Sequence, residues 1–325
     1  MTDAALEMRP EKFSDPDWTA EGEARASVRL EALRTLWINT GSFCNIECRN
    51  CYIESSPEND RLAYITRAEV RAFLDEIAQA GLPTREIGFT GGEPFMNPDI
   101  LLMLGDALAR GRSALVLTNA MQPMQRARVQ SGLLELREAH GARLLLRVSL
   151  DHHSAALHEK ERGPGTFTRT VEGIDWLAQN GFAVALAGRT CWGESEADAR
   201  EGYAALIAAH AWPIDAHDPF QLVLFPEMDV SVDVPEITTA CWGILGKSPS
   251  DVMCATSRMV VKRKGSARPV VLPCTLLPYD PAFEMGETLT EAARAHSGMF
   301  TNGAVKLCHP HCAKFCVLGG GSCSA

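Results

Sequence analysis

Short apolar runs alternate with longer amphipathic segments over the first two thirds of this chain. Each run has the length of one β-strand, and the segment after it carries its apolar residues at helical spacing. Such repetition predicts a parallel sheet, because a crossover between parallel strands needs a helix. The runs are apolar nearly throughout, as expected when both faces of the sheet are covered. The six expected strands span residues 35–40, 86–90, 113–118, 143–150, 182–188 and 220–225.

Helices are expected between these strands. The first has the clearest start, because Thr66 and Glu69 form a capping-box pattern and Gly81 follows as a stop signal. Six βα units fit either an open sheet or a partial barrel, and in both cases functional groups belong just after the C-terminal ends of the strands. The expected helices span residues 66–79, 98–110, 124–139, 167–179 and 196–210.

Composition narrows the class of protein. A chain of 325 residues has room for about two domains, or for one barrel with an appendage. Its 46 % apolar and 22 % charged residues are typical of a folded protein. The formal net charge of −10 argues against nucleic acid as a partner. The apolar runs fall far short of the ~20 residues of a membrane span, and the acidic, proline-broken N-terminus is no signal peptide, so we expect a cytoplasmic protein without a membrane partner.

Eleven cysteines are unevenly spread along the chain. An odd number of cysteines in a long chain that starts with no leader argues against a secreted disulfide framework. Clustered cysteines in a reducing compartment are more often ligands of a metal or an iron–sulfur cluster. Three stand near the front and four crowd the last 18 positions, so we predict two metal centres. These groups are Cys44, Cys48 and Cys51, and Cys308, Cys312, Cys316 and Cys323.

The front cysteines form a CxxxCxxC motif in the loop after the first expected strand. One loop with this spacing can bind one face of an iron–sulfur cube through Cys44, Cys48 and Cys51. Three ligands for four irons leave one iron open, as a catalytic site requires. The alternative is a zinc knuckle that a fourth ligand completes from elsewhere in the chain.

Tyr52 directly follows this motif, and the second expected strand ends in TGGEP at residues 90–94. Together the two motifs resemble those of the radical S-adenosylmethionine (radical SAM) superfamily, the second being similar to its GGEP motif. The likeness runs from about residue 35 to residue 225 and covers all six βα units. It implies an α/β fold, in which a partial (β/α)6 TIM-like barrel carries a small Cys-rich C-terminal domain.

The resemblance implies two cofactors. The three front cysteines would hold a [4Fe–4S] cluster whose open iron binds the amine and carboxylate of S-adenosylmethionine. Reduction by an external donor such as flavodoxin or ferredoxin would cleave that cofactor, and the resulting 5′-deoxyadenosyl radical would take hydrogen from a substrate carbon. Glu93 would accept a hydrogen bond from the methionine ammonium. Gly91 and Gly92 would let the backbone approach the ligand closely.

Further residues match positions that surround the cofactor in the superfamily. Asn119 would line the site after the third strand, and Ser149 and Asp151 would contact the ribose after the fourth. Arg189, after the fifth strand, would pair with the cofactor carboxylate, and Tyr52 would stack near the adenine. Each also has a plainer interpretation: a turn asparagine, helix caps, a surface arginine and a packed aromatic ring.

After the sixth expected strand the character of the sequence changes, since prolines and acidic residues interrupt any period. Two β-rich runs around Gly265 predict a hairpin, and the tail consists almost entirely of ligand and turn residues. We therefore divide the chain into an N-terminal extension (1–34), a radical SAM-like core (35–226) and a Cys-rich domain (227–325).

The Cys-rich domain resembles the SPASM and Twitch extensions of radical SAM enzymes, which carry auxiliary [4Fe–4S] clusters, and Arg162 lies in a segment common in that subgroup. Cys254 and Cys274 flank the expected hairpin, as the first auxiliary ligands do in such extensions. The resemblance favours one auxiliary cluster, held by these two and by two of the four terminal cysteines. Two clusters are possible if Cys241 joins, although the seven downstream cysteines cannot fill eight sites without an outside ligand. A zinc site that uses a histidine of the tail is the alternative.

Several residues near the expected mouth of the barrel are candidates for substrate contact. Cys191 follows the fifth strand and would return a hydrogen atom, as a thiol does in radical epimerases, unless it is a buried structural cysteine. Glu227 and Asp229 follow the sixth strand and would bind a cationic group, or they are solvated loop acids. Three histidines would serve proton transfer or lie solvated at a helix start: His152, His153 and His158.

These inferences predict a radical SAM enzyme of the oxidoreductase type. The leading reaction is the two-electron oxidation of a C–H group, in which an auxiliary cluster accepts the second electron. The first alternative is a peptide-modifying enzyme that makes crosslinks or epimerises residues. Only about 34 residues precede the first strand, too few for a leader-recognition domain, so we expect a small substrate or a leader bound by another protein. A non-catalytic iron–sulfur or zinc protein is the alternative from another class.

Overall fold

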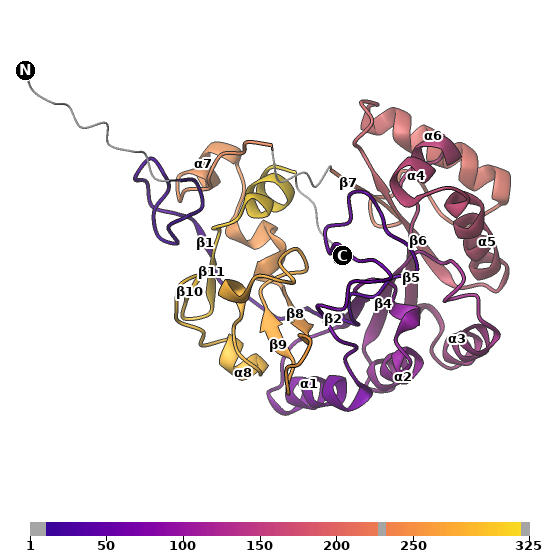
Figure 1. Ribbon diagram of the computed structural model, residues 1–325, viewed down its shortest axis with the longest axis horizontal. Helices are drawn as coiled ribbons and strands as arrows, with labels where there is room; N and C mark the ends of the chain where they lie inside the picture. The colour runs from indigo at the N-terminus through magenta and orange to yellow at the C-terminus, as the bar shows by residue number, and fades with distance from the viewer. Residues whose placement is uncertain (1–10, 227–231, 320–325) are drawn as a thin grey trace, which may run out of the picture.

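The parallel strands form one sheet, in the order in which they follow one another along the chain (Figure 1). The computed structural model describes residues 11–226 and 232–319, and in that part the largest sheet has the order β7-β6-β5-β4-β3-β2-β8-β9. Neighbours from β2 to β7 are all parallel, which confirms the expected partial (β/α)6 barrel. These strands are β2 (Thr35–Asn39), β3 (Glu86–Thr90), β4 (Ser113–Thr118), β5 (Leu144–Ser149), β6 (Ala183–Arg189) and β7 (Leu222–Phe225).

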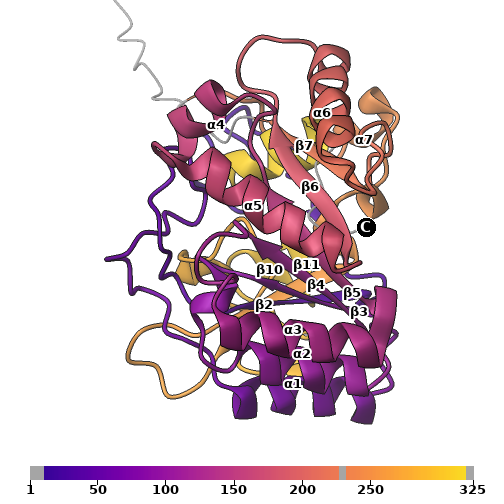
Figure 2. The same cartoon turned by 90° about the vertical axis from the view of Figure 1, so that its right-hand side faces the viewer.

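Helices cover the outer face of this sheet, and α1, α2 and α3 lie side by side there (Figure 2). The capping box at Thr66 forms as expected, since the Thr66 hydroxyl accepts from the Glu69 N–H and the Glu69 carboxylate accepts from the Thr66 N–H. In the described part, no helix is both long and apolar enough to cross a bilayer. The expected helices are α1 (Arg67–Gln79), α2 (Ile100–Ala109), α3 (Ala127–His140), α5 (Thr166–Gln179) and α6 (Glu196–His210), and α4 (Ala155–Arg162) is an additional one.

The barrel sheet continues into the C-terminal third of the chain. The hairpin expected around Gly265 forms from β8 (Ser257–Val261) and β9 (Val270–Leu272). Its first strand is parallel to β2, with Thr35 opposite Ser257, and this pairing was not evident from the sequence. Because Cys254 and Cys274 flank the hairpin, both cysteines are anchored to the edge of the barrel.

The N-terminal extension packs against the C-terminal third. Strand β1 (Ser27–Val28) pairs with β11 (Ala304–Lys306), which also pairs with β10 (Phe300–Thr301). Arg25 and Glu236 form an ion pair of 2.5 Å whose side chains are almost fully buried. Figure 1 shows these segments together, on the far side of β8 and β9 from the barrel helices.

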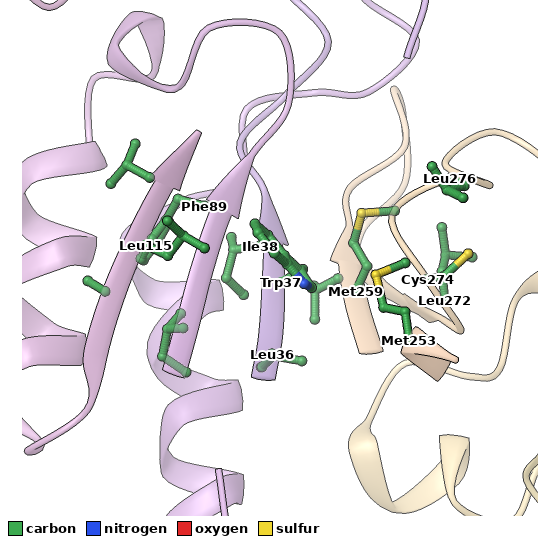
Figure 3. Close-up of a cluster of buried hydrophobic side chains, with 14 of the residues drawn as sticks. Leu36, Trp37, Ile38, Phe89, Leu115, Met253, Met259, Leu272, Cys274 and Leu276 are labelled. Carbon is green, nitrogen blue, oxygen red and sulfur yellow. The ribbon is translucent and has the colours of Figure 1, made fainter. Parts of the chain in front are cut away.

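One hydrophobic core joins the barrel to the C-terminal third (Figure 3). Trp37 of β2 is fully buried, with Phe89 of β3 toward the barrel and Met259 of β8 on the other side. Burying a side chain of this size contributes about 2–3 kcal/mol to folding, so the junction is a substantial part of the core. Short helices complete the region: α7 (Cys241–Leu245), α8 (Leu289–Ala292) and a π-helix (Cys312–Leu318).

Candidate active site

A cavity lies at the C-terminal ends of the parallel strands. Its walls come from the loop after β2, from the ends of β3, β4 and β5 with the residues that follow them, and from the ends of β6 and β7. Arg162 of α4 and two residues of the C-terminal third complete the lining. This is the edge where the βα pattern places functional groups. The cavity-lining residues that the sequence singled out are Cys44, Cys48, Cys51, Tyr52, Gly91, Gly92, Asn119, Ser149, Asp151 and Arg189.

The three front cysteines face this cavity from one loop. The loop is held by backbone hydrogen bonds, including the Cys44 N–H to the Ser56 carbonyl at 3.1 Å and the Arg49 N–H to the Glu161 carbonyl at 2.8 Å. Burial, with a smaller contribution from the charge of Glu93, raises the pKa of Cys44 to about 12. The Cys44 thiol is therefore protonated without metal, and binding iron must release its proton.

The spacing of the thiols bears on the zinc alternative. Four thiolates on one zinc ion lie about 3.8 Å apart, given a Zn–S bond of about 2.3 Å. Within residues 11–226 and 232–319, only His152, His153 and Glu194 bring three ligand atoms within 4.8 Å of one another. No three cysteines of the described chain meet that condition, which favours a larger iron–sulfur cube over a single zinc ion at either cysteine group.

The two glycines of the GGEP motif permit contact between two loops of the protein. A Cβ on Gly92 would lie 2.0 Å from the carbonyl oxygen of Phe43, and one on Gly91 would lie 2.5 Å from that of Gly41. Gly91 also has a φ of 137°, which favours glycine. The two glycines therefore allow the GGEP motif to pack directly against the cysteine loop, in addition to any contact with a ligand.

Glu93 lies behind the cavity wall and is bound by the end of β4. Its carboxylate accepts hydrogen bonds from the Thr118 hydroxyl at 2.9 Å, the Asn119 N–H at 2.9 Å and the Phe95 N–H at 3.1 Å. It is almost fully buried, and burial raises the pKa of Glu93 to about 7, although those three donors oppose the shift. Glu93 is absent from the cavity lining, so its contact with an ammonium group stays a prediction.

Asn119 connects Glu93 to the cysteine loop. Its backbone N–H donates to Glu93, while its side-chain amide donates to the side-chain Oδ1 atom of Asn45 at 2.9 Å. Asn45 directly follows Cys44 in the chain. The GGEP motif and the end of β4 thus position the cysteine loop from two sides.

Asp151 forms a buried charge cluster with two arginines on the cavity wall. Arg162 donates two hydrogen bonds to its carboxylate, at 2.8 Å and 3.0 Å, and Arg189 lies 3.5 Å away. Although burial alone raises the pKa of Asp151, these cationic charges bring it below its ordinary value. Arg162 enters from α4 and its charge also acts on Cys48. Its place in a segment common in the SPASM subgroup was the only sequence signal for this contact.

One group in this cluster is left without a partner. The Arg189 Nη1 atom is buried and has no hydrogen-bond partner among the described residues, while Nη2 donates to the Asn50 carbonyl at 3.0 Å. A buried guanidinium nitrogen needs an acceptor, and a ligand carboxylate in the cavity would supply one. The residues present therefore fit the amino-acid portion of S-adenosylmethionine. The Ser55 hydroxyl, which no sequence pattern indicated, is a second unsatisfied buried group on the cavity wall.

A second, smaller cavity lies in the C-terminal third. Four cysteines line it among apolar side chains: Cys254, Cys274, Cys312 and Cys316. His311 is a further lining residue. Cys308 points elsewhere, because its thiol donates to the backbone carbonyls of Phe13 at 3.2 Å and Asp15 at 3.4 Å. Of the terminal cysteines, the described structure thus brings two to the hairpin pair, and Cys323 lies outside the described residues.

The two cavities share a wall. Leu276 lines both, and of two consecutive residues in the π-helix, Phe315 lines the larger cavity and Cys316 the smaller. Phe315 also stacks on Phe225 at the end of β7, with ring centroids 5.6 Å apart. These apolar residues are part of the lining of the larger cavity, and the sequence pattern singled out none of them.

The remaining candidates within the described residues do not line either cavity. Cys191 is half-buried after β6, outside both linings. His152 is buried and lies 2.8 Å from Glu194 through Nε2, while its Nδ1 accepts from the Ser154 N–H. That acceptor role assigns the proton to Nε2, so His152 is oriented as a hydrogen-bond donor to Glu194. His153 is half-buried and His158 is buried, and Glu227 and Asp229 lie outside the described residues.

Comparison with known proteins gives one family match. The sequence model described as the Radical SAM superfamily matches residues 38–201, which is half of the chain. The antilisterial bacteriocin subtilosin biosynthesis protein AlbA of Bacillus subtilis (strain 168) is 30 % identical over 145 residues, which are 44 % of this chain and 30 % of that protein. The AdoMet-dependent heme synthase of Nitratidesulfovibrio vulgaris (strain Hildenborough) is 28 % identical over 142 residues, or 43 % of this chain and 35 % of that protein. The chain thus matches about a third of the length of these relatives.

A solved structure extends the likeness of fold beyond the barrel. Streptococcus suis SuiB bound to S-adenosylmethionine superposes with a TM-score of 0.57 at 12 % identity, covering 82 % of this chain and 66 % of that one. At this identity the match concerns the fold alone, and its coverage exceeds the length of the barrel.

Proposed function

This chain is a member of the radical SAM superfamily, and from that premise we propose that it oxidises a C–H group of its substrate by two electrons. The superfamily's cofactors are a [4Fe–4S] cluster and S-adenosylmethionine. When bound and reduced, they supply a 5′-deoxyadenosyl radical that removes a hydrogen atom from substrate. The proposal assigns Cys44, Cys48 and Cys51 to the cluster and the Nη1 atom of Arg189 to the methionine carboxylate.

The observation that supports this reaction is the wall shared by the two cavities. We propose that Cys254, Cys274, Cys312 and Cys316 hold an auxiliary [4Fe–4S] cluster behind Leu276. A substrate that has lost one hydrogen atom must lose one more electron and one proton to become a stable oxidised product. An auxiliary cluster in the smaller cavity would be separated from a substrate in the larger cavity by the side chain of Leu276. Four thiolates would complete the ligand set of that cluster.

Redox balance separates this proposal from epimerisation. Oxidation and crosslinking both remove two electrons from the substrate, since a crosslink forms at the expense of two bonds to hydrogen. Epimerisation removes none and instead needs a thiol that returns a hydrogen atom. Cys191 was the candidate donor, and its position outside the cavity lining favours oxidation or crosslinking.

The cavity also indicates a class of substrate. Its charged lining residues are Asp151, Arg162 and Arg189, and its lining also includes the apolar side chains of Phe225, Leu276 and Phe315. An apolar group of the substrate would therefore fit against these three side chains. One relative is named for bacteriocin biosynthesis and another as a heme synthase, so a peptide side chain and an apolar small molecule are both consistent with the names. We favour a peptide side chain, given the AlbA match.

Mass spectrometry of the product tests the reaction. The iron-loaded protein is reduced anaerobically and incubated in D2O with S-adenosylmethionine and synthetic peptides that present aliphatic or aromatic side chains. We expect a product lighter by the mass of two hydrogen atoms, in proportion to the 5′-deoxyadenosine formed. Cys312→Ala/Cys316→Ala is the informative variant and Cys308→Ala is its matched control.

The outcomes separate the alternatives. A product of higher mass, with deuterium from solvent at one carbon, would show epimerisation and contradict the oxidation. An unchanged yield of oxidised product from the double variant would remove the electron-accepting role of the smaller cavity. Failure to cleave S-adenosylmethionine at all would contradict enzymatic function and favour a non-catalytic iron–sulfur protein.

A further inference from the structure

Arg258 is a buried cation beside the smaller cavity. It is the second residue of β8, and only 2 % of its surface is exposed. Its Nη1 atom donates to the backbone carbonyls of Cys254 at 2.6 Å and Ser257 at 2.7 Å, and Nη2 donates to that of Gly303 at 3.3 Å. These contacts place the guanidinium against the turn that carries Cys254.

Two other buried arginines of this chain have carboxylate partners, and Arg258 has none among the described residues. Arg25 pairs with Glu236, and Arg162 pairs with Asp151. Within the described residues, no ion pair of 4.0 Å or less includes Arg258. The side chains that act on its charge are those of Cys254 and Cys274, whose thiols line the smaller cavity and would become anionic on binding metal.

A buried charge is costly unless an opposite charge compensates it. Carbonyl dipoles satisfy the N–H groups of Arg258 but leave its net positive charge uncompensated. A [4Fe–4S] cluster held by four thiolates is doubly negative when oxidised and gains a third negative charge on reduction. An anionic cluster in the smaller cavity would thus supply the counter-charge that Arg258 lacks among residues 11–226 and 232–319.

We propose that Arg258 is a positioning residue that supplies the counter-charge of the auxiliary cluster and raises its reduction potential. This inference rests on the proposed function, because it requires the cluster of the smaller cavity. A fixed positive charge stabilises the more negative, reduced state, and it does so strongly in a site from which water is excluded. Arg258 would therefore make the cluster a better acceptor of the substrate's second electron.

The test measures the potential of the auxiliary cluster alone. Cys44→Ala/Cys48→Ala/Cys51→Ala removes the other cluster, and Arg258→Gln, Arg258→Met and Arg258→Lys are made in that background. Gln retains hydrogen-bond donors for the carbonyls without the charge, and Lys retains the charge. The redox titration is followed by electron paramagnetic resonance. We expect Arg258→Gln and Arg258→Met to lower the reduction potential of the cluster by at least 59 mV, which is a tenfold change in the equilibrium constant of a one-electron step. Arg258→Lys should keep the potential within 59 mV of that of the parent.

Iron content makes the test decisive for variants that lose the cluster. If the variants with Arg or Lys at position 258 hold about four irons and those with Gln or Met hold none, the auxiliary cluster requires a positive charge at this position, which also supports the proposal. An unchanged potential in Arg258→Gln and Arg258→Met, or a Lys variant as impaired as Gln, would overturn the role of Arg258. A parent protein that holds no iron would instead overturn the auxiliary cluster, and with it this inference, while radical SAM membership would stand.

Discussion

Phe315 and Cys316 are consecutive in the chain, yet they line different cavities. Both belong to the π-helix Cys312–Leu318, a rare form that is frequent at functional sites. Phe315 stacks on Phe225, and Cys316 completes the set of four cysteines around the smaller cavity. The π-helix thus contributes to the walls of both cavities through neighbouring side chains.

The first prediction concerns the front cysteines. Replacing Cys44, Cys48 and Cys51 together with Ala should abolish the formation of 5′-deoxyadenosine, because the open iron depends on all three ligands. About four irons per chain should remain, which is one cube in the smaller cavity. Iron analysis and chromatography of the anaerobic reaction measure both quantities. Continued cleavage of S-adenosylmethionine would show that this loop does not hold the reactive cluster.

The second prediction compares two buried cysteines of the tail. Cys312→Ala should lower the iron content from about eight to about four atoms per chain, since it removes a thiol that lines the smaller cavity. Cys308→Ala should keep about eight, because that thiol is hydrogen-bonded to the carbonyls of Phe13 and Asp15. Equal iron loss in both variants would mean that the ligand set differs from the one proposed.

The third prediction tests the unsatisfied nitrogen of Arg189. Arg189→Lys removes Nη1 and should weaken S-adenosylmethionine binding by about 1–3 kcal/mol, the range for a hydrogen bond to a charged group. Anaerobic equilibrium dialysis of the iron-loaded protein measures the dissociation constant. Arg200→Lys is the control, because Arg200 pairs with Glu196 on α6 and does not line the cavity. A dissociation constant that Arg189→Lys leaves unchanged would assign this arginine to structure alone.

The fourth prediction is a pH dependence of stability that originates at Glu93. Its pKa is about 7 in the folded protein, against an ordinary value of 4.5, so the native state favours the protonated form. The corresponding contribution to stability is present below pH 4.5 and is lost as the pH rises through 7. It amounts to ~3 kcal/mol from a shift of this size.

Thermal unfolding of the iron-loaded protein between pH 5 and pH 8 can detect this contribution. The melting temperature should fall with rising pH, and the fall should be smaller in Glu93→Gln, which cannot titrate. Glu196→Gln is a suitable control, because Glu196 is an exposed carboxylate on α6. Identical pH profiles for the parent protein and Glu93→Gln would show that Glu93 does not titrate in this range.

Much of the barrel could be predicted from local pattern. The apolar runs and capping signals located every strand from β2 to β7 to within a few residues, and the CxxxCxxC and GGEP motifs indicated which strand ends carry the chemistry. Helix α4 was missed, because its polar sequence from Ala155 to Arg162 has little apolar periodicity. Arg162 reaches the cavity through that helix.

The sequence by itself determined the features that neighbouring residues encode, which are the strands, most of the helices, the cysteine loop and the family. Tertiary structure alone decided that β8 pairs with β2, that Cys308 turns toward the N-terminal segment, and that Cys312 and Cys316 join Cys254 and Cys274. The period of a strand specifies which of its faces is buried but not which distant strand it pairs with. That choice depends on the total burial achieved when the whole chain is packed, and residue spacing does not contain it.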